Sequence, residues 1–475
     1  MVFSSVVFLL FFMPCFFALY YLVPRSLKNY AALGGSVLFY AWGAPLFVFV
    51  VGAQVFVTFH LVRWMHLEKK EPRRKWLLGI SIGLNLALLL YFKYANFFVE
   101  NLNEVLYAVG IGQWEWTKVA LPIGISFFTF QTLTYCVDVY RKLHEPLHRY
   151  SDLLLYALVF PQLIAGPIVR FTLIADELTE RSHTTHQFLT GFFRFTIGLA
   201  KKVLIANTLG AHASGVFDTD ISSISSPEAW IAITAYTFQI YFDFAGYSDM
   251  AIGLGRMMGF HFPENFNNPY LSRSISEFWK RWHMTLSSWM RDYLYIPLGG
   301  NRVKTKSRLY FNLIVVFLIS GLWHGASWNF VIWGGFHGGF LILDRIFLLK
   351  VLERIGAIPA TVITFLVVLH GWVFFRIENF SGAVSFLEKM YSFQARQIPG
   401  DGNYHFLFIL LMAVLFSFIA AFTAGKKIER WVFDASRSMK AKDYILQSLL
   451  ACILFIICLS GIAAGGFNPF IYFRF

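Results

Sequence analysis

Two histidines in the segment 275–340 are the residues of this chain best suited to chemistry. His283 and His324 lie in a stretch that is otherwise aromatic and apolar. An ionisable side chain at membrane depth is costly, so by default it indicates a functional site. Histidine also has the side chain whose ordinary pKa suits proton transfer near neutral pH. The pair therefore predicts acid–base chemistry performed inside a membrane.

The position of His324 places its imidazole deep in the membrane. It lies about 15 residues into an apolar run that begins near residue 309, which corresponds to roughly 22 Å of helix. Gly321 and Gly325 flank it and permit close packing or a local break. For this residue alone, a core histidine bonded to a backbone carbonyl is an equally good interpretation.

His283 lies 41 residues before the other candidate, in a segment rich in Trp, Tyr and Arg. On a helix, Trp279 would be its i,i+4 neighbour, and Glu277 would pair with Arg281 in the same way. An interfacial helix with a tryptophan belt is the alternative interpretation of this segment. A second histidine in a nearby embedded segment favours a shared site.

Further polar side chains are candidates for supporting roles. Asp243 and Asp249 lie in one apolar run, where they could orient an imidazole, accept a hydrogen bond from a substrate hydroxyl, or satisfy buried polar groups. His337 lies among four glycines that indicate closely packed helices, and both a packing and a catalytic role stay open. Candidate N–H donors to a developing oxyanion, with His283 the strongest, are Trp282, Trp323 and Asn329.

Neither the histidines nor the cysteines have the spacing of a metal site, and no metal is expected. The basic residues around the histidine segment offer a cradle for an anionic cytosolic cofactor, because Arg binds phosphate in a bidentate manner. The positive-inside rule and contact with lipid phosphate explain most of them equally well. The candidates for cofactor binding are Lys280, Arg281, Arg291 and Arg302.

Composition predicts an all-α polytopic membrane protein. Of the 475 residues, 57% are hydrophobic and 14% are charged, whereas soluble domains carry about 25% charged residues. The apolar runs are continuous rather than alternating, which argues against a β-barrel. The net charge of +13 is concentrated in short loops, as in membrane proteins, and does not indicate nucleic-acid binding.

Basic clusters between the apolar runs predict about eleven crossings, with both chain ends extracytoplasmic and the first span retained. One domain, 1–475, is expected. The segment 152–169 is expected to be re-entrant or broken, because it contains prolines and a glycine. Lys201 and Lys202 fit badly inside a span: they snorkel, line a cavity, or indicate wrong boundaries. After the N-terminal span, the expected spans are 29–45, 46–65, 77–98, 119–137, 187–208, 228–258, 309–325, 328–349, 357–375, 404–424 and 443–464.

Two motifs carry a resemblance to a known family. SISEFWKRWHMTLSSWMRDYLYIPLGGNR and GLWHGASWNFVIWGGFHG are similar to segments of the membrane-bound O-acyltransferases. Within that family they resemble the bacterial branch typified by the membrane subunit of alginate O-acetylation. The resemblance extends over nearly the whole chain, through MVFSSVVFLLFFMP at the N-terminus and the segments 91–98, 121–141, 160–171 and 241–255.

The resemblance implies that His324 is the family's essential histidine and that His283 occupies the second active-site position. It implies a ring of tilted helices, with funnels from both faces that meet in a central catalytic tunnel. Donor would enter from inside and acceptor from outside. In this branch, located in the bacterial inner membrane, the acetyl group passes to a periplasmic partner similar to SGNH hydrolases.

The expected reaction is O-acetylation of a secreted or periplasmic polysaccharide, with acetyl-CoA as donor substrate and no bound cofactor. Alginate is the favoured acceptor, with cellulose, peptidoglycan and teichoic acid as alternatives. Two other classes stay open from the residues. A transporter or flippase for a polysaccharide or lipid-linked sugar would use His and Asp as proton relays, and predicts inverted repeats. A scaffold subunit predicts that His324→Gln preserves function.

Overall fold

The structure is a computed structural model that describes residues 1–393, 404–434 and 439–465. Every regular element within those ranges is a helix. This confirms the all-α prediction, and it follows from the environment, since a helix satisfies its backbone hydrogen bonds internally in lipid. The C-terminal segment 466–475, predicted to be extracytoplasmic, lies outside the described residues.

Two compact units make up the chain, and each is described by itself. The first unit comprises Met1–Ser182 and Gly259–Phe262. Its α-helices are α1 (Met13–Leu22), α2 (Lys28–Ala41), α3 (Phe47–Leu67), α4 (Glu71–Leu89), α5 (Ala95–Ala108), α6 (Ile125–Tyr140), α7 (Tyr150–Leu158), α8 (Phe160–Leu163) and α9 (Phe171–Thr179). Shorter turns are the π-helices Val7–Phe12 and Leu90–Tyr94 and the 3₁₀ turn Arg25–Leu27.

The second unit comprises His183–Met258 and Pro263–Phe475. Its α-helices are α10 (Thr185–Ala200), α11 (Asn207–Phe217), α12 (Ser226–Met257), α13 (Ile275–Arg281), α14 (Met284–Met290), α15 (Lys306–His324), α16 (Trp328–Leu343), α17 (Leu349–Ile355), α18 (Ala357–Arg376), α19 (Phe380–Met390), α20 (Tyr404–Phe418), α21 (Thr423–Phe433) and α22 (Ala441–Ala463). Shorter elements are the π-helices Lys201–Ala206, Arg291–Tyr295 and Asp344–Leu348 and the 3₁₀ turns Pro269–Leu271 and Ile419–Ala421.

Six helices of the described chain are long and apolar enough to cross a membrane. They coincide with six of the predicted spans, so a multi-pass membrane protein is confirmed, while the number of crossings stays a prediction. The helices α19 and α21 were not predicted. The six are Phe47–Leu67, Glu71–Ala108, Lys306–His324, Ala357–Arg376, Tyr404–Ala421 and Ala441–Ala463.

In the first unit, two local predictions have different outcomes. The segment 152–169 is broken, as predicted, into α7, the four-residue α8 and an irregular stretch. The helix expected from residue 119 begins only at Ile125, so that boundary is wrong. Gly124 precedes it with φ +78°, and a Cβ there would lie 2.5 Å from the carbonyl oxygen of Leu163. A left-handed glycine therefore delays the start of the helix.

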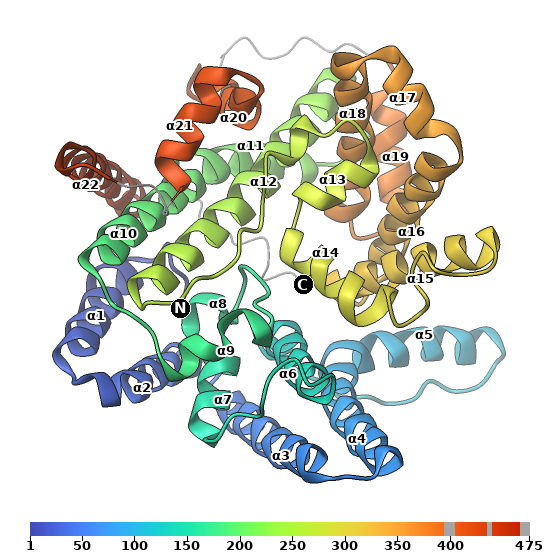
Figure 1. Cartoon of the computed structure of the whole chain (residues 1–475). Helices are drawn as coiled ribbons and strands as arrows, with labels where there is room; N and C mark the ends of the chain where they lie inside the picture. The colour runs from blue at the N-terminus through green and yellow to red at the C-terminus, as the bar shows by residue number, and fades with distance from the viewer. Residues whose placement is uncertain (394–403, 435–438, 466–475) are drawn as a thin grey trace. The chain divides into compact units, whose positions relative to one another are not determined.

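In the second unit, α10 and α12 pack through glycines spaced seven residues apart. A Cβ on Gly191 would lie 2.7 Å from the Gly253 carbonyl oxygen, and one on Gly253 would lie 2.5 Å from that of Gly191. Gly198 and Gly246 meet in the same reciprocal way. Figure 1 shows α10 and α11 running beside α12. Small residues allow this close backbone approach, which membrane helices use to associate.

We expect Gly253→Ala to destabilise the second unit by about 1–3 kcal/mol, because the new methyl group meets backbone atoms of α10 that cannot move aside. Gly215→Ala is the matched control, since the new Cβ on α11 would meet nothing within 4 Å apart from its own helix. Thermal unfolding in detergent measures both. Equal transition temperatures for the two variants would contradict the close packing.

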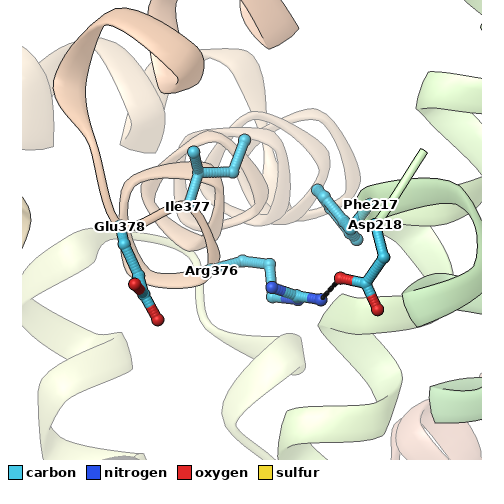
Figure 2. A pocket seen from close by; sticks show the side chains of 5 residues that line it. All are labelled: Phe217, Asp218, Arg376, Ile377 and Glu378. Carbon is cyan, nitrogen blue, oxygen red and sulfur yellow. Dashed lines mark hydrogen bonds and ion pairs between the residues drawn. The ribbon is translucent and has the colours of Figure 1, made fainter. Parts of the chain in front are cut away.

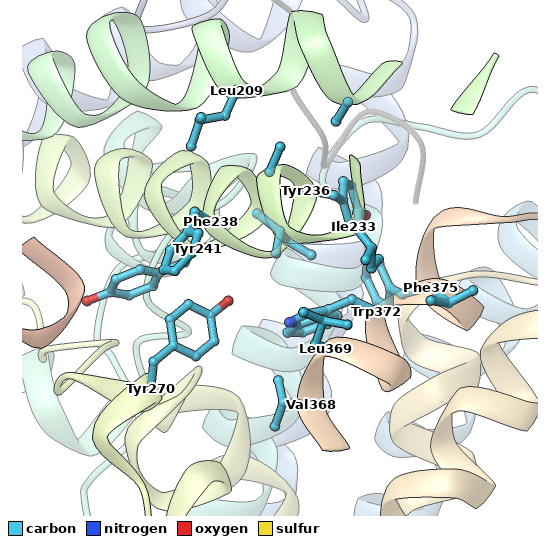
Figure 3. Close-up of a cluster of buried hydrophobic side chains, with 14 of the residues drawn as sticks. Leu209, Ile233, Tyr236, Phe238, Tyr241, Tyr270, Val368, Leu369, Trp372 and Phe375 are labelled. Carbon is cyan, nitrogen blue, oxygen red and sulfur yellow. The ribbon is translucent and has the colours of Figure 1, made fainter. Parts of the chain in front are cut away.

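The core of the second unit is formed mainly by α12 and α18, whose side chains interdigitate. Figure 3 shows Ile233 and Tyr236 of α12 facing Leu369 and Trp372 of α18. The hydroxyl group of Tyr270 donates a hydrogen bond to the carbonyl oxygen of Thr237, which ties the segment after α12 to this core. That segment carries the first candidate histidine.

Candidate active site

The two histidines that were expected to share a site lie together. Their ring centroids are 6.4 Å apart. His324 is the last residue of α15, and His283 directly precedes α14. His283 is 0% exposed and His324 is 4% exposed. The helix α15 begins at the basic residue Lys306, so the His324 imidazole lies about 27 Å along the helix from Lys306.

Glycines place His324 where it is. At Gly321, a Cβ would overlap the carbonyl oxygen of Phe330, so α15 and α16 approach closely. At Gly325, the backbone is extended and α15 ends. The two interpretations of these glycines, close packing and a local break, therefore both hold, one at each position. The break leaves His324 at a helix end, where its ring can face several elements.

His283 does not lie on the helix that was expected for it. The helix α13 ends at Arg281, Trp282 is extended, and His283 has a left-handed backbone with φ 45° and ψ 52°. The predicted i,i+4 placement of Trp279 beside His283 is therefore wrong, because the chain turns between α13 and α14. The expected ion pair between Glu277 and Arg281 does form, at 2.7 Å.

Asn265 holds the His283 ring. Its Oδ1 lies 3.0 Å from His283 Nδ1 and also accepts hydrogen bonds from the Thr285 hydroxyl at 2.8 Å and the Thr285 backbone N–H at 3.3 Å. Its Nδ2 donates to the hydroxyl oxygen of Ser248 at 3.1 Å. Asn265 was not among the predicted site residues. The only signal in the sequence is its place in a polar run, 264–268, ahead of the histidine segment.

Aromatic rings surround His324. Trp323, Trp333 and Phe375 lie with ring centroids 5.0, 5.1 and 5.4 Å from its imidazole. Trp323 also lies 6.0 Å from the His283 ring. These aromatic side chains exclude bulk water from the two imidazoles. Electrostatic interactions are stronger in such a dry site than in water.

The three predicted N–H donors differ in position. Trp323 contacts both histidine rings. Trp282 packs on Trp372, with ring centroids 4.9 Å apart, and so lies in the core. The Asn329 amide donates to the carbonyl oxygen of Phe374 at 3.3 Å, and its side-chain oxygen bonds the Ser327 hydroxyl. Of the three, the structure places only Trp323 against both imidazoles.

His337 is fully buried on α16 beside the site. Its ring lies 5.1 Å from both Trp279 and Trp333, and the latter also contacts His324. A Cβ on Gly371 of α18 would lie 2.7 Å from its Nε2, so the predicted close helix packing is confirmed here. Within residues 1–393, 404–434 and 439–465, no group of three or more His, Cys, Asp or Glu side chains could hold a metal ion.

Asp249, predicted as a supporting residue, binds two cations rather than an imidazole. It accepts hydrogen bonds from Arg194 Nε at 2.8 Å and from Lys201 Nζ at 2.6 Å. Arg194 also forms a bidentate pair with Glu264, at 2.6 and 3.1 Å. Of the three roles considered for this carboxylate, the structure supports the satisfaction of buried polar groups.

Asp243, the other predicted carboxylate, lies 2.6 Å from Lys202 Nζ. This pair and the network of Asp249 explain how two lysines fit inside a predicted span, which the sequence left unresolved. Both lysines lie in a π-helical turn between α10 and α11. Such single-turn bulges interrupt α-helices frequently at functional sites.

The predicted cofactor-binding cations all lie in the second unit, at or near its surface. Lys280 and Arg302 are exposed. Arg291 pairs with Asp292 at 2.7 Å, while Arg281 pairs with Glu277 of the same helix. A paired arginine keeps free donors, so all four can still meet an anionic ligand.

A pocket of about 550 Å³ opens at the end of α18. Figure 2 shows Arg376 reaching towards Asp218, to which it is ion-paired at 2.9 Å, with Phe217 and Glu378 on either side. Arg376 directly follows Phe375, whose ring contacts His324. The pocket is therefore lined by the residue that follows Phe375 in the chain. No sequence pattern indicated it, because its residues come from two distant segments.

Comparison with known proteins gives a consistent result. The family model described as MBOAT, membrane-bound O-acyltransferase family, matches residues 80–351, which include both histidines. A protein named as a probable alginate O-acetylase from Pseudomonas aeruginosa is 44% identical over 404 residues, or 84% of this chain and 76% of that protein. One of the same name from Pseudomonas putida is 38% identical, with both chains fully covered. A peptidoglycan O-acetyltransferase from Helicobacter pylori is 36% identical over 82% of this chain and 80% of that protein.

Proposed function

The chain belongs to the membrane-bound O-acyltransferase family, and on this premise we propose that it moves an acetyl group from a cytoplasmic donor across the inner membrane to O-acetylate a polysaccharide. The family makes it an acyltransferase, as the resemblance in its sequence predicted. The observation that carries the proposal is the buried pair His283 and His324, with rings 6.4 Å apart, inside the matched region.

In the proposed reaction, His324 is the general base. It removes the proton of an acceptor hydroxyl as the oxygen bonds to the acetyl carbonyl carbon. The carbon–sulfur bond of the donor thioester then breaks, and the departing thiolate takes up the proton that His324 removed from the acceptor. Acid–base catalysis of this kind contributes about 10²–10⁴-fold. An N–H donor at the developing oxyanion adds a comparable factor, and Trp323 is the best placed of the predicted indoles.

The proposed donor is acetyl-CoA, a substrate rather than a bound cofactor. Its phosphates would meet the cations of the basic face that precedes α15, from Lys280 to Arg302, which is the cytoplasmic face in the predicted topology. Exposed cations suit a ligand that must arrive and leave with each turnover. In this topology the N-terminus is extracytoplasmic.

The proposed acceptor is alginate, with cellulose and peptidoglycan as alternatives. Two of the relatives described above are named as alginate O-acetylases and one as a peptidoglycan O-acetyltransferase, which supports a polysaccharide of the cell envelope. We propose that a periplasmic protein similar to SGNH hydrolases receives the acetyl group first. The pocket beside Arg376 supports a route for that acceptor, because Arg376 follows Phe375, whose ring contacts His324, at the end of α18.

Proteoliposomes that contain the purified chain test the proposal. Acetyl-CoA labelled in the acetyl group is supplied on one side, and a polysaccharide oligomer with the periplasmic partner on the other. We expect release of the CoA thiol together with label in the partner or the polysaccharide. Movement of polysaccharide without thiol release or acetyl transfer would instead indicate a transporter.

The basic face gives a separate prediction. Lys280→Gln combined with Arg302→Gln should raise the KM for acetyl-CoA about tenfold, equivalent to about 1.4 kcal/mol, with little change in kcat. The defect should shrink as salt is added to both proteins, since exposed charges are screened. Lys118→Gln is the control, because this exposed lysine lies in a predicted outer loop. An unchanged KM in the double variant would remove the basic face from donor binding.

A further inference from the structure

The His283 ring has one hydrogen-bond partner in the described chain, the side chain of Asn265. Both residues are buried, at 0% and 1% exposure. We propose that Asn265 is the positioning residue of the active site, which holds the His283 imidazole with its proton on Nδ1 and leaves the lone pair on Nε2. The inference deepens the proposed function, since it assigns the direction in which this histidine can move a proton.

The neighbours of Asn265 decide which atom faces the histidine. The oxygen and nitrogen of an amide have nearly the same shape, so their hydrogen-bond partners must distinguish them. The Thr285 backbone N–H can only donate, and it points to the same atom as His283 Nδ1. The other amide atom lies 3.1 Å from the Ser248 hydroxyl, which can accept. The atom that faces His283 is therefore the oxygen, and Nδ1 must donate to it.

The protonation state of His283 follows from this bond. A neutral imidazole carries one proton, and a buried ring without a bonded carboxylate favours the neutral form. With that proton on Nδ1, Nε2 is an acceptor, and it has no hydrogen-bond partner among the described residues. His283 in the resting enzyme is thus a proton acceptor. It is not the N–H donor to an oxyanion that the sequence favoured.

Asn265 also fixes the backbone that carries the histidine. The Met284 N–H donates to the Asn265 carbonyl oxygen at 2.9 Å. One residue therefore bonds three consecutive positions: the His283 ring, the Met284 backbone, and the backbone and hydroxyl of Thr285. His283 itself has φ 45°, an uncommon conformation for a residue with a side chain. Such conformations persist only where surrounding contacts determine them, often at active sites.

Three variants test the role of Asn265 in the full-length protein. Asn265→Leu keeps the size of the side chain but removes the acceptor, and we expect kcat to fall about 10–100-fold with the KM for acetyl-CoA nearly unchanged. Asn265→Asp keeps the acceptor oxygens and should recover most of that loss. Asn312→Leu is the matched control, a fully buried asparagine of the same unit that bonds the Gly300 carbonyl oxygen instead. It should keep the kcat of the original protein.

Nitrogen-15 NMR of histidine-labelled protein reads the tautomer directly and independently of activity. We expect the signals of one imidazole whose Nδ1 is protonated and whose Nε2 is not. These signals should disappear in His283→Gln, change in Asn265→Leu and persist in Asn312→Leu. A proton on Nε2 of His283, or an unchanged tautomer in Asn265→Leu, would overturn the inference. If the original protein does not release CoA thiol, the proposed function is contradicted. The NMR result still decides the tautomer in that case.

Discussion

Replacing His324 with alanine is expected to abolish acetyl transfer while the protein stays folded and inserted. The variant removes the only base proposed to take the acceptor proton, so the rate should fall by about 10²–10⁴-fold, close to the limit of detection. Its ring packs against Trp323, Trp333 and Phe375, whose own contacts with the core remain. Release of CoA thiol and label in the acceptor measure the loss, and thermal unfolding in detergent checks the fold.

Two further variants distinguish a catalytic role of His324 from a structural one. His324→Gln keeps size and some hydrogen bonding but cannot act as a base, so it should be as inactive as the alanine variant. Activity in His324→Gln would favour a structural role for the histidine. His212→Ala is the matched control, since this half-buried histidine of the same unit stacks on Phe406 rather than on the rings around His324. It should retain acetyl transfer. Full activity in His324→Ala would remove the catalytic role altogether.

Replacing Asp249 with leucine is expected to cause the largest loss of stability. The carboxylate is buried between Arg194 and Lys201, whose side chains are 4% and 21% exposed. Removing one partner of a buried ion pair leaves an uncompensated charge, which typically lowers the free energy of unfolding by about 3–5 kcal/mol. Chemical unfolding in detergent, followed by tryptophan fluorescence, measures the change.

A second substitution tests the cause of that loss. Adding Lys201→Met to Asp249→Leu removes one of the two stranded cations, so part of the stability should return. The recovery of stability should be incomplete, because Arg194 then keeps only Glu264 as a carboxylate partner. Arg291→Gln breaks an exposed pair instead and should cost less than about 1 kcal/mol. A loss in Asp249→Leu no larger than that of Arg291→Gln would contradict a structural role for the buried network.

Hydropathy and residue type determined the helical, membrane-spanning character of this protein and pointed to its two histidines. Lipid imposes long apolar runs on helices that cross it, so α3, α15, α18 and α22 could be located without coordinates. An ionisable residue in such a run is conspicuous in the sequence itself. The i,i+4 pair of Glu277 and Arg281 was predictable for a similar reason, because helix geometry alone brings them together.

Contacts between distant segments decided the rest. Lys201 and its partner Asp249 are 48 residues apart in the sequence, and Asn265 and His283 are 18 residues apart. No local periodicity encodes such distances, so the role of the lysines and the support of the histidine appear only once α10, α12 and the segment after α12 are packed. The left-handed turn at His283, which broke the predicted helix, is likewise fixed by bonds from Asn265 rather than by its own preference. The sequence alone thus determined which groups could react, and the tertiary structure decided which atoms they present, because hydrogen-bond partners from other segments set each orientation.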